Sequence, residues 1–403
     1  MQPFSVASTT TSESEMTTPD RMGLLSILDH GSMDDMRVLV TDGAMNKSLA
    51  IVRAIADVTT HVGVTSRFPI SVAGTSRYAD KRYWIRDRDP SSYVRRLNQI
   101  AAAHDYDQLL PVGGSSFELA SNFRHELALP VERILPPREA MDVALAKGCT
   151  YALAEDVGIP TPRTVRVAEP ADLESAANSV GFPAVVKTGT ETGTRFVRRV
   201  ESETELERAY EDYRRENTVD PVVQEYLPGV ASGYFAFYLD GELVAGYSHK
   251  RVREYPPEGG ASACAESEEN DELRRYAQDL LDSLEWHGVA MVEFKEDTNG
   301  VPSIVEINPK FWGSIDLGIA SGLNFPRALL EYTAGKTAFS FEFTPTRYSW
   351  PLSGDLTHVW RRPNSARAVL ADLIDPTTRT NLRRDDPLPH VVETLVTVIR
   401  QDI

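Results

Sequence analysis

The chain has 403 residues, of which 41% are hydrophobic and 25% charged, and this composition predicts a soluble globular protein of two or three domains. Its formal net charge of −17 argues against binding to nucleic acid or to an anionic membrane, because both require a basic surface. No apolar run approaches the length of a membrane-spanning helix. Cys149 and Cys264 lack the spacing of a disulfide framework or a metal site, so we expect a reduced, cytoplasmic setting.

The N-terminal part divides into an irregular segment and a regular one. Residues 1–35 are rich in serine, threonine and acidic residues without periodicity, and we expect them to be disordered. Residues 37–41 and 62–65 then predict buried strands, and residues 49–55 predict a helix between them. A strand, a helix and a strand joined by short links predict a parallel sheet. The first turn holds a single glycine, which excludes the dinucleotide-binding fingerprint because that motif needs several.

A further strand is predicted over residues 108–112, and it runs into two glycines and two serines at residues 113–116. Ligands commonly bind at the carboxyl ends of the strands in such a sheet. The backbone N–H groups of this turn are suited to a substrate carboxylate. The alternative is an ordinary turn into the helix that follows.

Two lysines lie where they would suit phosphate binding. Lys147 opens a predicted helix, for which a solvated side chain is the simplest interpretation. Lys187 ends a short apolar strand and is followed by a Gly/Thr-rich loop over residues 188–194. An ammonium group beside such a loop suits a triphosphate, because loop N–H groups and hydroxyls also bind phosphate.

A cluster of cationic side chains falls within residues 249–253 of an otherwise acidic chain. Pro-Pro and Gly-Gly pairs follow and predict a loop, which would carry the cations toward an anionic ligand. We therefore assign Lys250, Arg251 and Arg253 to a substrate carboxylate or a transferred phosphoryl group, with a solvated charged face as the alternative. His249 is interpreted as either a base or a hydrogen-bonding strand residue.

The strongest local signal is a hairpin over residues 289–308, where an Asn-Gly turn joins two β-rich runs. The pairing expected from this turn sets Glu293 opposite Ile304 and places Glu293, Glu306 and Asn308 on one face. Two carboxylates and an amide oxygen among apolar neighbours are costly unless a positive charge lies between them. A hard divalent cation such as Mg²⁺ meets that demand, and a solvated acidic face is the alternative.

The motif Glu-Ile-Asn-Pro-Lys at residues 306–310 resembles the metal site of the ATP-grasp superfamily, and the order of the preceding segments matches that family too. The resemblance, to enzymes of the carbamoyl-phosphate synthetase and D-alanine–D-alanine ligase type, covers roughly residues 36–335. It implies an α/β fold with a parallel-sheet pre-ATP-grasp domain at residues 36–140. A two-subdomain α+β ATP-grasp domain would follow at residues 141–337, and a C-terminal helical extension at residues 338–403.

The resemblance also implies ATP and Mg²⁺ or Mn²⁺ as cofactors, and it assigns roles to individual residues. Lys310 would neutralise charge on the transferring group, where many relatives have arginine. The implied metal ligands are Glu293, Glu306 and Asn308. The implied nucleotide-binding residues are Lys147, Lys187, Thr188, Gly189, Gly193, Gln224, Glu225, Tyr226 and Leu227.

The implied reaction is activation of a carboxylate as an acyl-phosphate and its ligation to an amine, with release of ADP and phosphate. Two alternatives stay open: a carbamoyl-phosphate or carboxylase-type enzyme, and a non-catalytic ATP-binding regulatory protein. The expected partners are small-molecule carboxylate and amine substrates, with a homodimer as a possible assembly. The C-terminal extension carries no recognisable chemistry, so we expect it to serve packing or oligomer formation.

Overall fold

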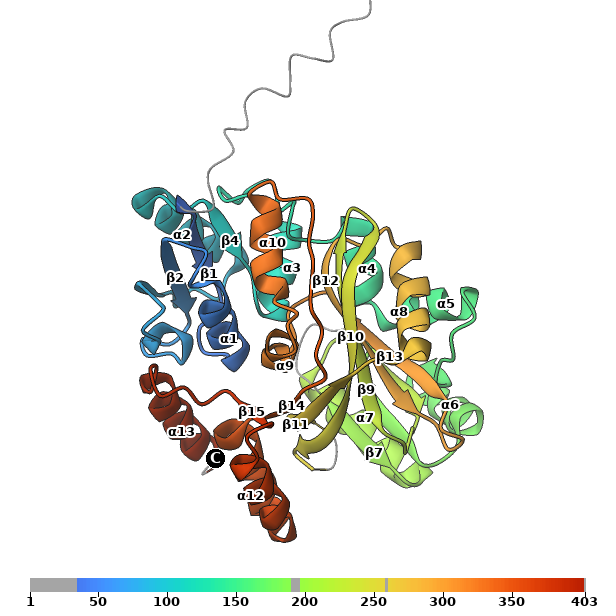
Figure 1. Cartoon of the computed structure of the whole chain (residues 1–403). Coiled ribbons are helices and arrows are strands. Elements are labelled where there is room, and N and C mark those ends of the chain that lie inside the picture. Colours follow the sequence, from blue (N-terminus) through green and yellow to red (C-terminus); the bar gives the residue numbers. More distant parts are fainter. Residues whose placement is uncertain (1–34, 190–195, 258–259, 402–403) are drawn as a thin grey trace, which may run out of the picture.

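The computed structural model describes residues 35–189, 196–257 and 260–401 (Figure 1). The N-terminal segment that we expected to be disordered lies outside these ranges, except for Asp35. Gly193, for which we expected a role in nucleotide binding, also lies outside them. Among the described residues, no helix combines the length and the apolar character that crossing a membrane requires.

The first unit contains the expected parallel sheet. Its strands lie in the order β3-β2-β1-β4, with the bounds β1 (Arg37–Val40), β2 (His61–Ser66), β3 (Lys81–Trp84) and β4 (Gln108–Leu110). The helices are α1 (Asn46–Ile55), α2 (Pro90–His104) and α3 (Gly114–Asn122). Val38, Leu39 and Val40 are fully buried, as expected for a strand covered on both faces. α3 begins just beyond the end of β4, where such sheets bind ligands.

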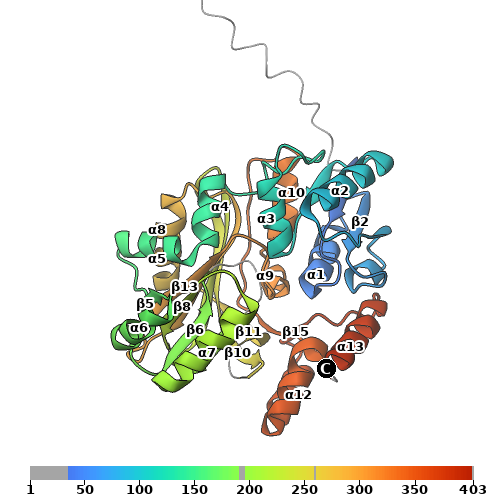
Figure 2. The same cartoon turned by 180° about the vertical axis from the view of Figure 1, so that it is seen from behind.

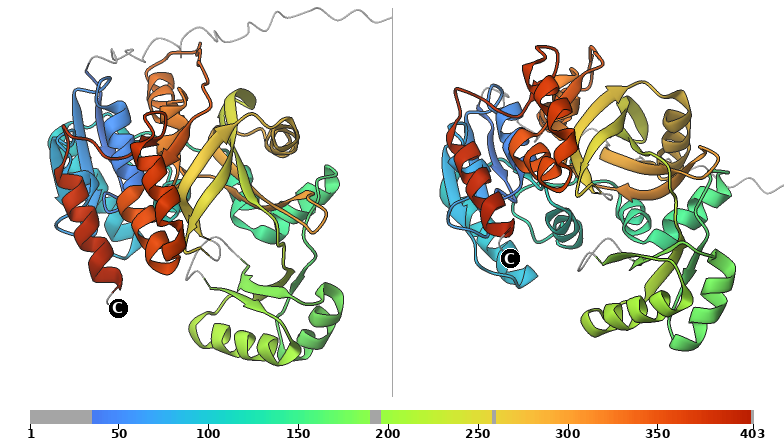
Figure 3. Two further views of the ribbon diagram at one scale, coloured as in Figure 1. Left: turned by 60° about the horizontal axis from the view of Figure 1, so that its bottom comes forward. Right: turned by 90° about the horizontal axis from the view of Figure 1, so that it is seen from below.

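A small antiparallel sheet forms the second unit, which is set off from the rest of the molecule and coloured green in Figure 3. Its strands lie in the order β5-β8-β6-β7, with the bounds β5 (Thr164–Arg166), β6 (Ala184–Thr188), β7 (Val197–Val200) and β8 (Pro221–Glu225). Helices α6 (Leu173–Val180) and α7 (Glu203–Glu216) complete the unit. Val186, Val223 and Leu206 belong to its separate apolar core.

A large mixed sheet forms the centre of the molecule, with its strands in the order β13-β12-β9-β10-β11-β14-β15. Its longer strands are β9 (Ala231–Leu239), β10 (Glu242–Tyr255), β11 (Ala261–Glu268), β12 (Gly288–Glu296) and β13 (Pro302–Asn308). Side chains of β9 alternate between two cores: Tyr234 and Ala236 face one, and Phe235 and Phe237 face the other. The sheet is therefore covered on both sides.

Different helices cover the two faces of this sheet. The helices of one face, gathered together in Figure 2, are α4 (Arg138–Leu145), α5 (Lys147–Asp156) and α8 (Asp271–Ser283). The other face packs against α9 (Ile315–Ala320) and α10 (Phe325–Thr333). This second face shares one apolar core with the first unit, so the parallel sheet and the large sheet are held together without a gap in packing.

The C-terminal segment is only partly helical. Its helices are α11 (Leu356–Arg361), α12 (Ala366–Ile374) and α13 (Leu388–Gln401). Two short strands, β14 (Arg347–Ser349) and β15 (Arg379–Thr380), extend the large sheet and were not expected. Strands of three and two residues are too short to show an alternating pattern in the sequence. The remaining short helical turns are Ala73–Thr75, Pro170–Asp172, Pro351–Asp355 and Pro363–Ser365.

Candidate active site

The hairpin of β12 and β13 is present, but its register differs from the expected one. Glu293 lies opposite Glu306 rather than Ile304 for two reasons: the pairing begins with Glu296 opposite Pro302, one residue later than expected, and a bulge between Glu293 and Phe294 leaves one extra residue on β13. Directly opposite residues in an antiparallel pair have side chains about 5 Å apart, and like charges in such positions repel. The bulge thus brings two carboxylates closer together than the sequence indicated, which strengthens the demand for a cation.

A chain of hydrogen bonds runs along the edge strand β13. Lys147 Nζ donates to Glu306 Oε2 at 2.7 Å, and Asn308 Nδ2 donates to Glu306 Oε1 at 2.7 Å. Lys310 Nζ in turn donates to Asn308 Oδ1 at 2.5 Å. Lys147 is only 7% exposed, so its ammonium group and the Glu306 carboxylate form a largely buried pair. The structure therefore brings four predicted site residues into one connected group.

Glu293 is held by a cation that comes from two strands away. Arg251 on β10 donates from Nη2 to Glu293 Oε1 at 2.7 Å, although β9 lies between their strands. Gly233 is the residue of β9 directly beside Glu293 and also beside His249. A Cβ atom on Gly233 would lie 3.1 Å from Phe235 Cζ and 3.3 Å from Met291 Cε, so this glycine leaves room for two apolar side chains. The contact of Arg251 with Glu293 across β9 was not predicted from the sequence.

The predicted metal ligands fit a hard cation that also binds phosphate. The described ranges contain no group of three His, Cys, Asp or Glu side chains able to hold a metal ion. The predicted set has two carboxylates and one amide oxygen, all oxygen donors. Mg²⁺ is commonly bound by one or two carboxylates together with substrate phosphates and waters. The residues present thus suit Mg²⁺ or Mn²⁺ bound with a nucleotide rather than a metal held by protein alone.

Tyr151 of α5 connects Lys187, which is predicted to bind phosphate, to the hairpin. Its hydroxyl accepts from Lys187 Nζ at 3.2 Å and from Gln224 Nε2 at 2.9 Å, and it donates to the Val305 carbonyl at 2.9 Å. Lys187 and Gln224 belong to the small sheet, so this one hydroxyl joins the second unit to the large sheet. Tyr151 was not predicted as a site residue, although it lies one helical turn after Lys147 and therefore shares its side of α5.

Removing the Tyr151 hydroxyl should lower the stability of the folded protein. In the Tyr151→Phe variant the buried Lys187 and Gln224 side chains lose an acceptor, and the Val305 carbonyl loses a donor. We expect the free energy of unfolding to fall by about 1–3 kcal/mol, measured by urea denaturation. The control is Tyr276→Phe, whose hydroxyl makes one exposed hydrogen bond to Glu272, and which should change stability by less than about 0.5 kcal/mol. Equal effects of the two substitutions would contradict this role.

Residues 224–227, which the resemblance assigns to nucleotide binding, already make other contacts within the protein. The N–H groups of Glu225 and Tyr226 donate to the carbonyls of Arg163 and Pro183, so a base cannot pair with those two donors. Arg163 also donates to the Glu225 carboxylate at 3.0 Å, and this hydrogen bond lowers the pKa of that carboxyl. Leu227 is buried. Only the other backbone groups of this stretch can meet a base edge.

The start of the predicted phosphate loop is described, and its tip is not. Thr188 is the last residue of β6, and its N–H donates to the Phe196 carbonyl. Gly189 approaches the backbone of the neighbouring segment closely: a Cβ atom there would lie 3.2 Å from the Asp220 carbonyl oxygen. A larger side chain at this position would therefore push the loop away from β8.

The cationic segment is a strand, so the prediction of a loop was wrong. Lys250, Arg251 and Arg253 all belong to the 14-residue strand β10, which pairs with β9 and β11. Lys250 is half-exposed and lies 3.4 Å from the carboxylates of Glu266 and Glu268. The breakers that suggested a loop follow the strand, and pairing on both sides outweighs the local charge density. Of the three cations, only Arg251 contacts the predicted metal site.

Arg253 and His249 are internal residues of the sheet. Arg253 is 7% exposed and donates to both oxygens of Asp355, at 2.7 and 3.1 Å, and to Asp372 at 2.5 Å. His249 is 1% exposed, and burial lowers its pKa to about 3, so the imidazole is neutral. Its Nδ1 atom lies 3.4 Å from Ser314 Oγ. Of the two interpretations of His249, the hydrogen-bonding strand residue fits this environment.

The first unit meets the site at Lys310. A Cβ atom on Gly114 would lie 3.2 Å from Lys310 Cδ, so the absence of a side chain at the start of α3 leaves room for the lysine side chain. Asp42 accepts from the Gly113 N–H at 2.7 Å, and Lys47 donates to the Phe311 carbonyl at 2.6 Å. The two-glycine turn thus lies against the end of the predicted metal motif.

The fold and this arrangement define a protein of the ATP-grasp class, and comparisons with known proteins agree. Residues 217–350 match the family model described as "ATP-grasp in the biosynthetic pathway with Ter operon". A D-alanine–D-alanine ligase of Ectopseudomonas mendocina is 27% identical over 218 residues, which are 48% of this chain and 66% of the ligase. The large chain of carbamoyl phosphate synthase from Methanosarcina mazei is 24% identical over 239 residues, 54% of this chain and 22% of the synthase.

A solved structure shows the same fold. The biotin carboxylase of Campylobacter jejuni superposes with a TM-score of 0.64 at 15% identity, covering 78% of this chain and 74% of the carboxylase. The chain thus has the fold of ATP-grasp proteins, and residues 217–350 also resemble an ATP-grasp family in sequence. It spans less than two thirds of the length of the two curated relatives named above.

Proposed function

We propose that this protein is an ATP-dependent ligase. It activates a carboxylate as an acyl-phosphate with Mg·ATP and joins it to an amine, releasing ADP and phosphate. The observation that carries the proposal is the pair of opposed carboxylates, Glu293 and Glu306, with Arg251 and Lys147 bonded to them and Lys310 bonded to Asn308. Carboxylates suit a metal ion and lysines suit phosphate, so the two together suit a metal–triphosphate complex.

The predicted residues gathered around the hairpin have separate roles in this proposal. Lys147 and Lys187 bind phosphate oxygens, and Glu293, Glu306 and Asn308 hold Mg²⁺ or Mn²⁺. The bound metal ion would supply neutralisation of phosphate charge. Phosphoryl transfer asks little covalent chemistry of a protein, so positioning and charge are what these side chains contribute.

The substrate carboxylate is proposed to bind where Lys310 meets the turn at Gly113 and Gly114. Lysine is a compact point charge and can follow one oxygen of the transferring group, whereas arginine would impose a planar fork. The base of the nucleotide is proposed to lie along residues 224–227, between the small sheet and β13. Thr188 and Gly189 open the loop that would lie over the phosphates.

Names of relatives support the reaction class rather than the substrates. D-alanine–D-alanine ligase joins an acid to an amine by its name, while carbamoyl phosphate synthase and biotin carboxylase are named for other products. Bicarbonate therefore belongs in any substrate screen beside ordinary carboxylates.

The test is ADP release from Mg·ATP against a matrix of amino acids, other small carboxylates, bicarbonate and amines. A ligase should release ADP with one acid–amine pair and form the amide in equal amount. Release that depends on bicarbonate without an amine would instead indicate a carboxylase. Nucleotide binding without release for any pair would contradict the ligase and support a regulatory ATP-binding protein.

A further inference from the structure

Exposed apolar side chains gather at the end of the molecule where α12 and α13 lie, at the bottom of Figure 1. Nine of the 19 large apolar side chains that are exposed in the described ranges fall within residues 356–395. Single apolar residues scattered over a surface are normal, whereas a concentration of them indicates a surface that another molecule covers. None of the predicted nucleotide, metal or substrate residues lies within this stretch.

Helix α12 has an apolar side that faces away from the protein. Of its nine residues only Val369 and Asp372 are buried, and the side opposite them carries Leu370, Ala371 and Ile374. Leu370 is 60% exposed and Ile374 is 74% exposed. Residues three and four positions apart share one side of a helix, so these three form a single apolar stripe. A helix that is apolar on nearly every side is normally buried rather than left in water.

The two other helices of the C-terminal segment carry similar stripes. On α13, Leu388, Val391 and Leu395 are exposed at spacings of three and four, and on α11 Leu356 and Trp360 are exposed one turn apart. At roughly 100 Å² for each half-exposed side chain, the nine offer about 900 Å², close to the about 800 Å² that each partner buries in a standard interface. These stripes, together the C-terminal face, are therefore large enough for a stable protein contact.

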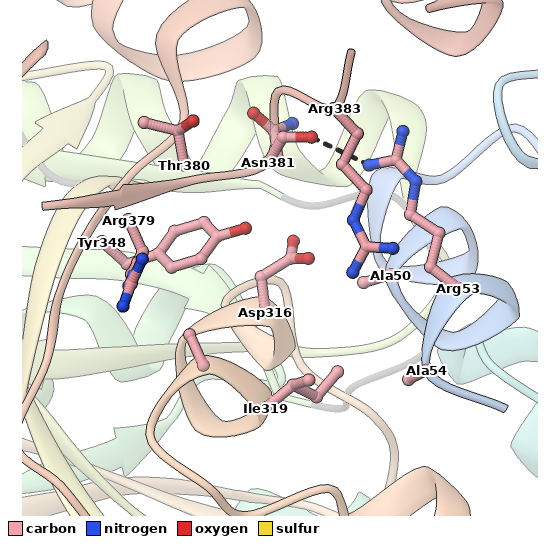
Figure 4. Close-up of a pocket in the computed structure, with 11 residues that line it drawn as sticks. Ala50, Arg53, Ala54, Asp316, Ile319, Tyr348, Arg379, Thr380, Asn381 and Arg383 are labelled. Carbon is pink, nitrogen blue, oxygen red and sulfur yellow. Dashed lines mark hydrogen bonds between the residues drawn. The ribbon is translucent and has the colours of Figure 1, made fainter. Parts of the chain in front are cut away.

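The C-terminal face is held in a fixed orientation on the body of the protein. Asp372, on the inner side of α12, binds Arg253 Nη1 at 2.5 Å and Arg347 Nε at 2.8 Å. Arg53 of α1 donates to the Asn381 carbonyl at 2.8 Å, which fastens the segment between α12 and α13 to the first unit (Figure 4). A surface that is already ordered loses little conformational entropy when a partner binds it.

The charges at the two ends of α12 indicate what the partner is. Arg367 lies in the first turn and Asp375 follows the last residue, and both are exposed. The helix macrodipole favours the reverse order, acidic at the N-terminus and basic at the C-terminus. An antiparallel copy of α12 that crosses at Ala371 would place Arg367 beside Asp375 of the partner subunit, because each lies four residues from the crossing point. Such exposed pairs contribute little binding energy but decide the orientation in which two surfaces meet.

We propose that the C-terminal face joins two copies of this chain in a symmetric dimer, with α12 packed antiparallel against the α12 helix of the partner subunit. In a two-fold dimer the same surface of both copies forms the contact, so the surface must be complementary to itself. The α12 stripe meets this condition, since its apolar middle excludes water and its two ends carry opposite charges. The stripes of α11 and α13 extend the contact on either side.

The first experiment measures the molar mass of the full chain by light scattering during gel filtration. At micromolar concentrations the mass should be twice the 44.7 kDa of one chain. In the variant Leu370→Glu, Ile374→Glu the contact would bury carboxylates, so the dissociation constant of the dimer should rise at least about a hundredfold. Both positions are exposed in the single chain, so circular dichroism should not change. The matched control Phe68→Glu, Ile70→Glu alters two exposed apolar residues of the first unit and should stay dimeric.

Crosslinking tests the direction of the two helices. In an antiparallel contact that crosses at Ala371, this residue meets its own copy, whereas the two copies of residue 374 lie about 9 Å apart along the helices. The background is Cys149→Ser, because Cys149 is exposed while Cys264 is buried. Under mild oxidation Ala371→Cys should give a disulfide-linked dimer and Ile374→Cys should not, because a disulfide requires Cα atoms within about 7 Å. Crosslinking of Ile374→Cys as efficient as that of Ala371→Cys would overturn the antiparallel contact.

Two outcomes of the mass measurement would overturn the dimer itself. One is a full chain that keeps the mass of a single copy at every concentration, and the other is a dimer that survives Leu370→Glu, Ile374→Glu. In the first case, a variant lacking residues 1–34 that does dimerise would identify the N-terminal segment as the occupant of the C-terminal face.

Discussion

Replacing Glu306 by glutamine should lower Mg²⁺-dependent nucleotide turnover by at least about a hundredfold. Glutamine keeps the size of the side chain but removes the negative charge that faces Glu293, Lys147 and the proposed metal ion. With one carboxylate left, the site would hold the metal more weakly and would position the phosphates less well. The measurement is ADP release under saturating ATP, together with the Mg²⁺ concentration that gives half-maximal release, which should rise.

The control for this variant is Glu296→Gln, a carboxylate on the same hairpin that lies outside the predicted site. Glu296 accepts only a long contact from the Val230 N–H, at 3.5 Å, so its removal should leave turnover within about twofold of the unmodified protein. Thermal unfolding of both variants must be compared, because Glu306→Gln also removes the buried ion pair with Lys147. Folded Glu306→Gln protein with unchanged turnover and unchanged Mg²⁺ dependence would refute the metal-site assignment.

Local signals in the sequence located the hairpin but not its register. The Asn-Gly turn and the two β-rich runs predicted β12 and β13 correctly, and the acidic face followed from alternation. The bulge beside Glu293 could not be predicted, since the extra residue on β13 is not a glycine and its position depends on how the edge strand meets α5. The result is a closer acidic pair than expected, with the same three metal ligands proposed.

Contacts between distant segments account for most of what the sequence did not reveal. Arg251 and Glu293 are 42 residues apart and meet because the pairing of β10, β9 and β12 places both side chains on one face of the sheet. Tyr151 was not predicted as a site residue, and its contact with Lys187, 36 residues later in the chain, is seen only in the structure. The density of positive charge in the sequence predicted that cations lie near a ligand. The pairing of the strands determines that Arg251 is the cation that reaches the predicted metal site.

Arg253 connects strand β10 to the C-terminal segment. Of the substitutions considered, its replacement should lower the free energy of unfolding the most. In Arg253→Met, the buried Asp355 carboxylate would lose its bidentate partner and keep only the Ser349 hydroxyl, whereas Asp372 would lose one hydrogen bond and keep its ion pair with Arg347. Removing one partner of a buried ion pair typically costs about 3–5 kcal/mol, because the remaining charge stays buried without compensation. We expect a fall of this size in the free energy of unfolding, measured by urea denaturation. Arg367→Gln, at an exposed position on α12, is the control and should change stability by less than about 0.5 kcal/mol.

The double variant Arg253→Met, Asp355→Asn separates an electrostatic cause from a loss of packing. Asparagine at position 355 removes the uncompensated charge and keeps an acceptor for the Ser349 hydroxyl, so at least about 1 kcal/mol should return. No recovery would mean that the aliphatic part of Arg253, rather than its charge, holds the C-terminal segment on β10. ADP affinity of the folded Arg253→Met protein gives the complementary result. It should equal that of the unmodified protein, because Arg253 contacts the C-terminal carboxylates and not Glu293 or Glu306.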